Sequence, residues 1–431
     1  MNIATLIAPD ATGTQTDNGL TLTTDQQTAL DALFHFMADP IETVFVLSGY
    51  SGCGKSTLVR TLLDRLPAYQ KTLKLINPSF AERTVTLTAT TNKAAENLAH
   101  ITGQEVFTIH SVLGLRVSTD YRTSVTTLVG KPNFERPTHQ LIFIDEASFV
   151  DKELLGLIFT RTDRCKIIFV GDPAQLSPVK ATTTPVFDAG FTGATLTQVV
   201  RQAEGNPIVG LSTQFRHTVN TGEFFSFKPD GHHIRRMSRE DFNAAIEQEF
   251  TRPDWRYHDS KILGWTNKCV IGYNQYVRNK AKGDPHFQEG DYAVCNSFLS
   301  VGKSSIKTDQ LVQITQIEPA CTNQGVVGHW MTLDHSTRVF QPASLATKLA
   351  RIKEARAEED FRLVAEMESQ WADLRGAYAN TINKSQGSTY GSVFVDLDDI
   401  RRCNSGDQIA RMMYVGVSRA RDHVYMTGDL A

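Results

Sequence analysis

The hydrophobic and polar positions divide the chain into short apolar runs that alternate with amphipathic stretches. Between 43 and 200, short strand-sized segments rich in apolar residues precede segments in which apolar residues recur at helical spacing. This alternation is typical of a parallel sheet with right-handed helical crossovers. It predicts strands at Val44–Leu47, Val85–Ala89, Leu141–Ile144 and Ile167–Val170, and helices at 55–66, 92–101 and 151–160.

A second alternating region begins near 196, with strands predicted at Lys261–Trp265, Val393–Leu397 and His423–Met426. Within it, 290–340 is rich in β-prone residues and punctuated by glycine. The following segment, 344–375, is predicted to be helical, because apolar residues recur at helical spacing among mixed charges. The apolar residues of this pattern are Leu363, Met367, Trp371 and Leu374. A plain solvated helix and a helical part of an inserted domain both fit that segment.

Residues 115–138 interrupt the first alternating region with a threonine-rich, β-prone stretch. Its alternation predicts an inserted hairpin with Asp120–Arg122 near the tip, and Pro132 and Pro137 would end the pairing. An ordinary surface loop is the alternative.

The fold class predicted is therefore α/β, with two parallel-sheet domains that each carry an insertion. The predicted domains are a flexible tail at 1–20, a first domain at 21–195 including the hairpin insertion, a second at 196–289 plus 379–431, and an inserted domain at 290–378.

Composition narrows the class of protein. Apolar residues make up 41% and charged residues 21% of 431 positions, which excludes whole-chain disorder. The N-terminus lacks the pattern of a signal peptide, and no apolar run has the length of a membrane span, so a cytoplasmic protein with no membrane partner is expected. A net charge of −3 argues against a generally basic binder but leaves room for a local basic channel.

Cysteine and histidine spacing gives no metal motif. The six cysteines form no CxxC pair, which predicts free thiols in a reducing compartment and no structural zinc. The adjacent His232 and His233 are interpreted as part of a polar loop, because no second ligand pair lies close in the sequence.

The segment GYSGCGKST, residues 49–57, follows an apolar strand and precedes a helix. It fits the phosphate-binding pattern G-x-x-x-x-G-K-[ST], in which glycines let backbone N–H groups surround the phosphates at a helix N-terminus. Lys55 would neutralise the β- and γ-phosphates, and Ser56 would supply an oxygen to Mg²⁺. The other candidate phosphate-binding residues here are Gly49, Gly52, Gly54 and Thr57.

Two further strands end in polar residues where ligands bind in open parallel sheets. Leu141–Ile144 delivers Asp145 and Glu146, of which the first would hold Mg²⁺ and the second would orient and deprotonate an attacking water. Ile167–Val170 leads into GDPAQLSP, whose Gln175 is placed to sense a γ-phosphate. The alternatives without a catalytic role are two solvated acids for Asp145 and Glu146, and an ordinary Gly-Asp-Pro turn for the second motif.

Three more motifs follow along the chain: VRQ at 200–202, NKSQGST at 383–389 and YVGVSRAR at 414–421. Together with the motifs above, they occur in the order of the superfamily 1 helicase motifs. The chain resembles the 5′→3′ branch, superfamily 1B, and within it the Dda-like and RecD-like helicases. The resemblance spans positions 26 to 421. It implies two RecA-like motor domains, with an SH3-like and helical insertion in the second.

The resemblance also implies roles in the nucleotide cleft. Gln26 would contact adenine, although Gln27 is close enough to compete for that role. Arg201 and Arg419 would reach the γ-phosphate as arginine fingers. For Arg201 the alternative is a surface salt bridge.

A nucleic-acid track is implied in the same way. In ATTNKAA, Thr91 would bond a phosphate, and Thr90 replaces the usual proline, a departure expected to alter only turn stiffness. Asn383 stands where relatives often carry histidine, which puts a role for that position in doubt. The candidate strand contacts are Thr91, His110, Ser111, Trp265, Asn267, Ser388 and Thr389. A buried structural histidine and a core tryptophan are the alternatives for His110 and Trp265.

The function implied is an ATP- and Mg²⁺-dependent translocase on single-stranded DNA that unwinds forked duplex 5′→3′, in phage or bacterial replication or recombination. The protein is expected to be a monomer, with replication or single-strand-binding proteins as candidate partners. Its expected location is the cytoplasm, or the host cytoplasm if the protein is viral. Two alternatives stay open: a superfamily 1 RNA helicase, and a remodeller that displaces proteins from DNA without strong unwinding.

Overall fold

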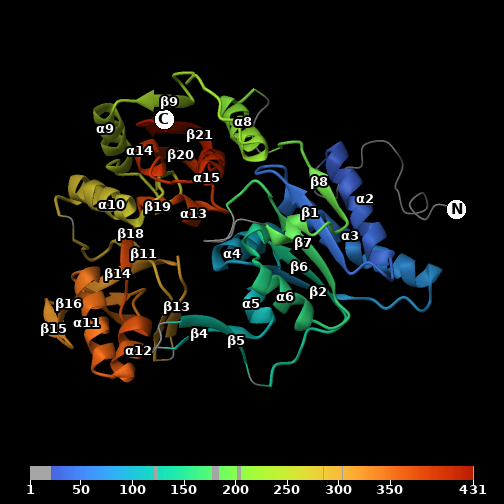
Figure 1. The fold of residues 1–431 in the computed structure, drawn as a ribbon, viewed down its shortest axis with the longest axis horizontal. Coiled ribbons are helices and arrows are strands. Elements are labelled where there is room, and N and C mark those ends of the chain that lie inside the picture. The colour runs from blue at the N-terminus through green and yellow to red at the C-terminus, as the bar shows by residue number, and fades with distance from the viewer. Residues whose placement is uncertain are drawn as a thin grey trace. The chain divides into compact units, whose positions relative to one another are not determined.

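The computed structural model describes residues 21–120, 125–131, 133–176, 184–200, 205–284, 286–302 and 304–430. The predicted tail at 1–20 lies outside these residues. The chain divides into two compact units. Unit 1 contains the residues up to Arg116 together with Val129–Val209, and unit 2 contains Val117–Leu128 and the residues from Gly210 onward. The two units are labelled by their elements in Figure 1.

Unit 1 is built on a six-stranded parallel sheet with the strand order β3-β2-β6-β7-β1-β8. Its strands are β1 (Val44–Gly49), β2 (Thr84–Ala89), β3 (Val106–Thr108), β6 (Gln140–Asp145), β7 (Lys166–Gly171) and β8 (Gly193–Leu196). Its helices are α2 (Thr24–Ala38), α3 (Lys55–Ile76), α4 (Asn92–Thr102), α5 (Ile109–Val112), α6 (Lys152–Thr160) and α7 (Pro185–Asp188), with a 3₁₀ turn at Ala147–Phe149.

Both faces of this sheet are covered, which explains the continuous apolar runs of its strands. Every residue of β7 is buried. One hydrophobic core joins the sheet to α2 and α3, and a second joins its other face to α5 and α6. Helix α3 runs past Pro67, so the end predicted at residue 66 was wrong. The buried Tyr69 and Leu73 beyond the proline pack in the first core, and this packing offsets the lost backbone hydrogen bond.

Within 115–138 the chain forms β4 (Leu115–Asp120) and β5 (Val125–Gly130), which pair as a two-stranded sheet. The predicted tip lies partly outside the described residues. The base of the hairpin is held by Arg161 of unit 1. Its Nε donates to the Leu113 carbonyl oxygen at 2.7 Å, and its guanidinium lies 4.5 Å from the centre of the Phe134 ring.

Unit 2 carries a five-stranded parallel sheet with the order β19-β10-β20-β21-β9. Its strands are β9 (Ile234–Met237), β10 (Ser260–Gly264), β19 (Ala379–Thr381), β20 (Tyr390–Asp396) and β21 (Ala420–Thr427). Its helices are α8 (Pro207–Thr221), α9 (Arg239–Phe250), α10 (Asn267–Lys282), α13 (Ile382–Ser385), α14 (Leu397–Ile400) and α15 (Gly406–Ser418). The two parallel α/β sheets confirm the predicted fold class.

An antiparallel sheet occupies the segment between α10 and β19. Its order is β15-β16-β14-β11-β18, with β17 paired to β16, and β12 and β13 form a separate pair. The strands are β11 (Tyr292–Cys295), β12 (Leu299–Val301), β13 (Ser304–Ile306), β14 (Leu311–Ile317), β15 (Cys321–Asn323), β16 (Val326–Leu333), β17 (Thr337–Pro342) and β18 (Leu374–Gly376). Helices α11 (Leu345–Ala357) and α12 (Phe361–Ser369) pack on β16 and β17 through a shared core.

The helical prediction for 344–375 was wrong at its C-terminal end. Leu363 and Met367 lie on α12, but Trp371 forms a bridge with Phe340, and Leu374 begins β18. The Trp371 ring is 1% exposed and meets the Phe340 ring edge-on at 4.8 Å. Strand pairing and burial of the indole therefore decide the conformation here, although the spacing alone is also compatible with a helix.

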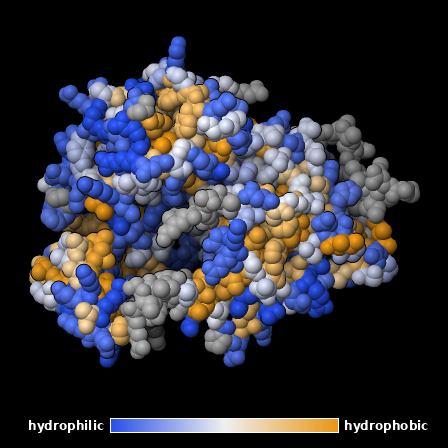
Figure 2. Space-filling view, in the orientation of Figure 1, coloured by the Kyte–Doolittle hydropathy of each residue, from blue (hydrophilic) through white to orange (hydrophobic). Residues whose placement is uncertain are grey.

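Among the described helices, none is both long enough and apolar enough to span a membrane. On the face seen in Figure 2, hydrophilic residues cover much of the region of α9 and β9, and apolar residues occur in small groups among them.

Candidate nucleotide and nucleic-acid sites

The loop between β1 and α3 has the geometry that a phosphate requires. Gly52 and Gly54 have φ angles of +84° and +75°, a region that favours glycine. Helix α3 has no side-chain cap and no acidic residue in its first turn, so its N-terminal N–H groups and dipole are available to an anion. The Lys55 Nζ donates to the carbonyl oxygens of Gly49 and Tyr50, at 2.7 and 3.1 Å. This holds the ammonium group over the loop.

The two candidate glutamines are separated by their surroundings. Gln26 is 3% exposed, and its Nε2 donates to the carbonyl oxygen of Cys53, within the phosphate-binding loop, at 3.0 Å. Its Oε1 accepts from the Thr23 N–H in a capping box at the start of α2. Gln27 instead donates to Asp31 of its own helix at the surface. The structure thus places Gln26, and not Gln27, against the loop.

The acidic pair lies at the carboxyl end of β6. Burial raises the pKa of the Asp145 carboxyl, while the N–H of Glu146, which donates to it at 2.9 Å, and the charge of Lys55 oppose this rise. Glu146 has a φ angle of +52°, an uncommon conformation for a residue with a side chain. A buried carboxylate near the Lys55 ammonium fits a divalent-cation site, since such an ion would favour the charged form.

Gln175 sits in the turn after β7, the strand between β1 and β6 in the sheet. It is 3% exposed, and the neighbouring Asp172 is fully buried and accepts from the Ala174 N–H at 2.9 Å. The carboxyl ends of β1, β7 and β6 are adjacent, so the phosphate-binding loop, Gln175 and the acidic pair share one edge of the sheet. Of the other cleft residues, Ser56 and Thr57 lie in the first turn of α3, and Arg201 lies outside the described residues.

The predicted strand contacts of unit 1 follow β2 and β3, at the same edge. The Thr91 hydroxyl caps α4 by accepting from the Ala94 N–H, and this bond leaves its own hydrogen to donate. Ser111 is exposed on α5, while His110 is half-buried. Burial lowers the pKa of the His110 imidazole, partly opposed by Asp151, so a neutral ring is favoured near pH 7.

Thr90, expected to alter only the stiffness of its turn, also makes two hydrogen bonds to the acidic pair. Its N–H donates to the Asp145 carbonyl oxygen at 3.2 Å, and its hydroxyl donates to the Glu146 carbonyl oxygen at 3.1 Å. A proline makes neither bond. Thr90 therefore ties the loop that carries Thr91 to the strained turn that carries Glu146.

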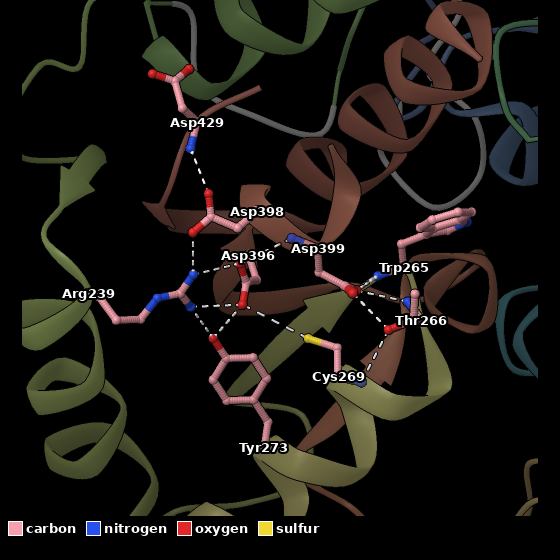
Figure 3. A network of polar contacts seen from close by, with 9 residues as sticks. All are labelled: Arg239, Trp265, Thr266, Cys269, Tyr273, Asp396, Asp398, Asp399 and Asp429. Atoms are coloured by element: carbon pink, nitrogen blue, oxygen red, sulfur yellow. Dashed lines mark hydrogen bonds and ion pairs between the residues drawn. The ribbon is translucent and has the colours of Figure 1, made fainter. Parts of the chain in front are cut away.

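In unit 2, Asp399 holds the turn that follows β10 (Figure 3). Its carboxylate accepts from the backbone N–H groups of Trp265 and Thr266, at 2.7 and 2.8 Å, and from the Thr266 hydroxyl at 2.7 Å. Asp399 is 4% exposed, and the Trp265 indole points away from it and is half-buried. The core alternative for Trp265 is thereby disfavoured, and its backbone is fixed.

The same network continues through Asp396 at the end of β20 (Figure 3). Arg239 donates to Asp396 at 2.8 and 3.0 Å and to Asp398 at 2.6 Å, and the Tyr273 hydroxyl donates to Asp396 at 2.7 Å. Burial alone would raise the pKa of Asp396, but these hydrogen bonds from Arg239 and Tyr273 hold it below its usual value. The carboxylate stays charged and anchors α9, α10 and β20 together.

A small polar cavity lies beside Asn267. Its polar lining consists of Asn267, Asn296, Arg375, Asn380, Thr381 and Lys384. Arg375 donates to Asn267 at 2.7 Å, and Lys384 donates to both Asn296 and Asp309 at 2.6 Å. Both cations are also ion-paired, Arg375 with Asp373 at 3.1 Å and Lys384 with Asp309, so a phosphate oxygen would share them with these carboxylates.

Ser388 and Thr389 precede β20, whereas Trp265 follows β10, and these strands run parallel. The structure therefore places the two groups of predicted strand contacts at opposite ends of the sheet. Arg419 is 3% exposed and donates through NH1 to the Ser388 carbonyl oxygen at 3.3 Å, so the NKSQGST and YVGVSRAR motifs meet there. Asn383, whose role the sequence leaves in doubt, lies on α13.

Sequence reasoning missed four residues that shape these sites: Thr90 as a tie to Glu146, Asp399 as the anchor of Trp265, and Arg375 and Lys384 at the polar cavity. Lys384 was visible as the lysine of NKSQGST. Asp399 gave no local signal, because its partners Trp265 and Thr266 lie more than 130 positions away.

Comparison with known proteins gives two family matches: an AAA domain over residues 21–238 and a UvrD-like helicase C-terminal domain over residues 376–427. The ATP-dependent DNA helicase dda of Enterobacteria phage T4 is 23% identical over 429 residues, covering 88% of this chain and 93% of that protein. The ATP-dependent RecD2 DNA helicase of Deinococcus radiodurans is 25% identical, covering 89% and 47%. A solved Pif1 helicase from Bacteroides, in complex with ADP-AlF3 and ssDNA, has a TM-score of 0.49 and 15% identity, covering 96% and 93%.

Proposed function

The chain belongs to the AAA-domain family and to the superfamily 1B helicases, and we propose from this premise that it is an ATP-driven motor that moves 5′→3′ along single-stranded DNA and unwinds forked duplex. The observation that carries the proposal is the shared edge of the unit 1 sheet. Three adjacent strands, β1, β7 and β6, end at this edge. They are followed there by the uncapped N-terminus of α3 with Lys55, by Gln175, and by the Asp145–Glu146 pair.

Each group at this edge has a chemical role in ATP hydrolysis. The backbone of the β1–α3 loop and Lys55 would bind and neutralise the phosphates, and the Gln26 contact keeps the loop in place. Ser56 and Asp145 would hold Mg²⁺, which supplies charge stabilisation to the transferred phosphoryl group. Glu146 would accept a proton from the attacking water, and Gln175 would respond to the γ-phosphate. Arg201 and Arg419 keep the arginine-finger roles that the resemblance implies.

The strand track of the proposal consists of exposed or half-buried polar residues at the carboxyl ends of strands. In unit 1 these are Thr91, His110 and Ser111, which follow β2 and β3. In unit 2 the Trp265 indole would stack on a base, and the exposed Asn267 with the Arg375 beside it would receive a phosphate. Ser388 and Thr389 lie beside Arg419. This placement favours a role for them in communication between the bound DNA strand and the nucleotide. Work on chromosomal or phage DNA would place the protein in the cytoplasm, with replication or single-strand-binding proteins as partners.

Tailed duplexes test the proposal directly. We expect the protein, with ATP and Mg²⁺, to separate a duplex that carries a 5′ single-stranded DNA tail and to leave the 3′-tailed duplex paired. Unwinding of the 3′-tailed duplex instead would overturn the polarity. A preference for an RNA tail would favour an RNA helicase. ATP hydrolysis stimulated by DNA without strand separation would favour a remodeller that displaces proteins.

The Thr90→Val substitution tests coupling between the strand track and the catalytic turn. Valine keeps the N–H and the shape but removes the hydroxyl that bonds the Glu146 carbonyl. Loss of this one hydrogen bond, worth about 1 kcal/mol, should lower the DNA-stimulated kcat about five-fold and leave DNA affinity nearly unchanged. The matched control is Thr86→Val on β2, the strand that ends just before Thr90, because the Thr86 hydroxyl bonds Gln140 instead. Equal kcat values for the two variants would show that Thr90 does not act on Glu146.

Substitution of Asp399 tests the placement of Trp265. Asp399→Ala leaves two backbone N–H groups and the Thr266 hydroxyl without their acceptor, so the turn should lose its order. Because one base stacked on an aromatic ring contributes about 1–3 kcal/mol, we expect affinity for single-stranded DNA to fall about ten-fold by fluorescence anisotropy. Asp399→Asn keeps an acceptor oxygen and should retain most of the affinity. Full affinity in Asp399→Ala would remove Trp265 from the track.

A further inference from the structure

Three histidines converge at the edge of the unit 2 sheet. His232 and His233 precede the edge strand β9, and His423 lies in the neighbouring strand β21. One ring nitrogen from each of the three lies within 4.8 Å of one from each of the others. The parallel pairing of β9 with β21 causes this, since Val424 stands opposite Ile234 and its N–H donates to the His233 carbonyl oxygen at 2.7 Å. His423 supplies the further ligand that the sequence did not place beside His232 and His233.

Hydrogen bonds prepare two of these rings as metal ligands. The Nδ1 of His233 lies 3.0 Å from the Asp422 carbonyl oxygen, and the Nδ1 of His423 lies 3.3 Å from the His232 carbonyl oxygen. A carbonyl oxygen only accepts, so each Nδ1 carries the hydrogen and each Nε2 keeps its lone pair. Metal-bound histidines in proteins show this same pattern, in which the second ring nitrogen donates to a carbonyl or carboxylate.

The loop that carries the pair is also ordered. The Asp230 carboxylate accepts from the N–H groups of His232 and Ile234, at 2.9 and 2.8 Å, and Gly231, between Asp230 and His232, has a φ angle of +76°. The rings of His233 and His423 are nearly parallel, with centres 5.8 Å apart, and the His232 ring meets His233 edge-on at 4.5 Å. His232 is exposed and the other two are half-buried, so one side of the cluster faces solvent.

We propose that His232, His233 and His423 bind one divalent transition-metal ion of the zinc class, with water in the fourth position. Three neutral imidazoles suit Zn²⁺, Co²⁺ or Ni²⁺ and do not suit Mg²⁺, which prefers oxygen ligands. At metal–nitrogen distances of about 2.0–2.1 Å the three nitrogens must approach one another to roughly 3.5 Å, which requires the rings to rotate from their present positions. The site is separate from the Mg²⁺ position at Asp145.

The bound ion would fasten the edge strand to the rest of its sheet. Among the strands that the structure describes, β9 pairs with β21 alone, and β21 begins directly after Arg419. An ion that links residues before β9 to a residue in β21 stabilises the folded state, because the unfolded chain lacks the assembled site. It would also limit movement of β21, the strand that begins directly after Arg419.

Cobalt titration of the full chain, stripped of metal by a chelator and kept free of nucleotide, tests the proposal. We expect one equivalent of Co²⁺ to bind with intense visible bands of a four-coordinate ion, to be displaced by Zn²⁺, and to raise the melting temperature by about 3 °C or more. His232→Ala and His423→Ala should each weaken Co²⁺ binding at least about 100-fold. Because His232 is exposed, His232→Ala is less disruptive to folding than His423→Ala. Circular dichroism checks that both variants are folded.

The matched control is His286→Ala, a side chain that is 86% exposed and lies outside the cluster. It should bind Co²⁺ like the parent. Absence of binding by the parent, parent-like binding by His232→Ala, or a thiolate-to-cobalt charge-transfer band, which would assign the ion to cysteine, would each overturn the proposal. Because no nucleotide or DNA is present, the result is independent of the helicase assignment.

Discussion

A Glu146→Gln enzyme is expected to bind ATP and DNA normally but to hydrolyse ATP at least about 100-fold more slowly than the parent, since general-base catalysis contributes about that factor or more. Glutamine keeps the volume of the side chain and the backbone turn, whose carbonyl oxygen still accepts from Thr90. It removes only the carboxylate that would take the proton from water. Steady-state ATPase with saturating single-stranded DNA measures the loss, and equilibrium binding of a fluorescent ATP analogue checks that the nucleotide site is intact.

The control for this variant is Glu153→Gln, an exposed acid in the first turn of α6 of the same unit. It changes the same functional group without approaching the acidic pair, so its turnover should match that of the parent. If Glu146→Gln hydrolyses ATP at close to the parent's rate, Glu146 is not the base, and the proton must pass to another group at this edge.

The second large effect is expected from the hairpin. Replacement of 118–126 by a short Gly/Ser turn should leave DNA-stimulated ATPase and translocation nearly intact, because neither the nucleotide edge nor the strand contacts are altered. The rate of duplex unwinding should fall at least about ten-fold, which corresponds to an increase of about 1.4 kcal/mol in its activation free energy. A motor that pulls one strand separates a duplex only if a structural element blocks the other strand, and we propose β4 and β5 as that element.

A less severe variant acts on the hairpin's base. Arg161→Ala removes the 2.7 Å bond to the Leu113 carbonyl and the stacking on Phe134, so it should loosen the hairpin and lower unwinding by a smaller factor. Arg164→Ala, whose side chain is 72% exposed, is the matched control in the same unit. Parent-like unwinding of a 5′-tailed duplex by the hairpin replacement would move the separating element to 290–375.

The residues of the nucleotide edge were predictable because each signal is local. A run such as VFVLSG followed by glycines and Lys-Ser specifies a strand, a tight turn and a helix within thirteen positions. Parallel pairing then brings the ends of β1, β7 and β6 to one edge without further information. For the same reason the order of the motifs was enough to identify the superfamily.

Helix ends were less predictable, because local pattern and tertiary packing compete there. Pro67 predicts a helix end, yet α3 continues to Ile76 through burial of Tyr69 and Leu73. Trp371 and Leu374 continue a helical spacing, yet they leave the helix to pair with Phe340 and with β11. In both places the area buried in the core outweighs the preference of the local sequence.

The sequence by itself therefore determined the fold class and the superfamily, and it identified the residues that meet at the nucleotide edge, all of which depend on residues close together in the chain. Only the tertiary structure decided which distant partners support them: Thr90 on the Glu146 turn, Asp399 beneath Trp265, Arg161 at the hairpin base and His423 beside His232. These pairs are 48 to 191 positions apart. Their contacts arise from strand pairing and side-chain packing, which no local periodicity encodes.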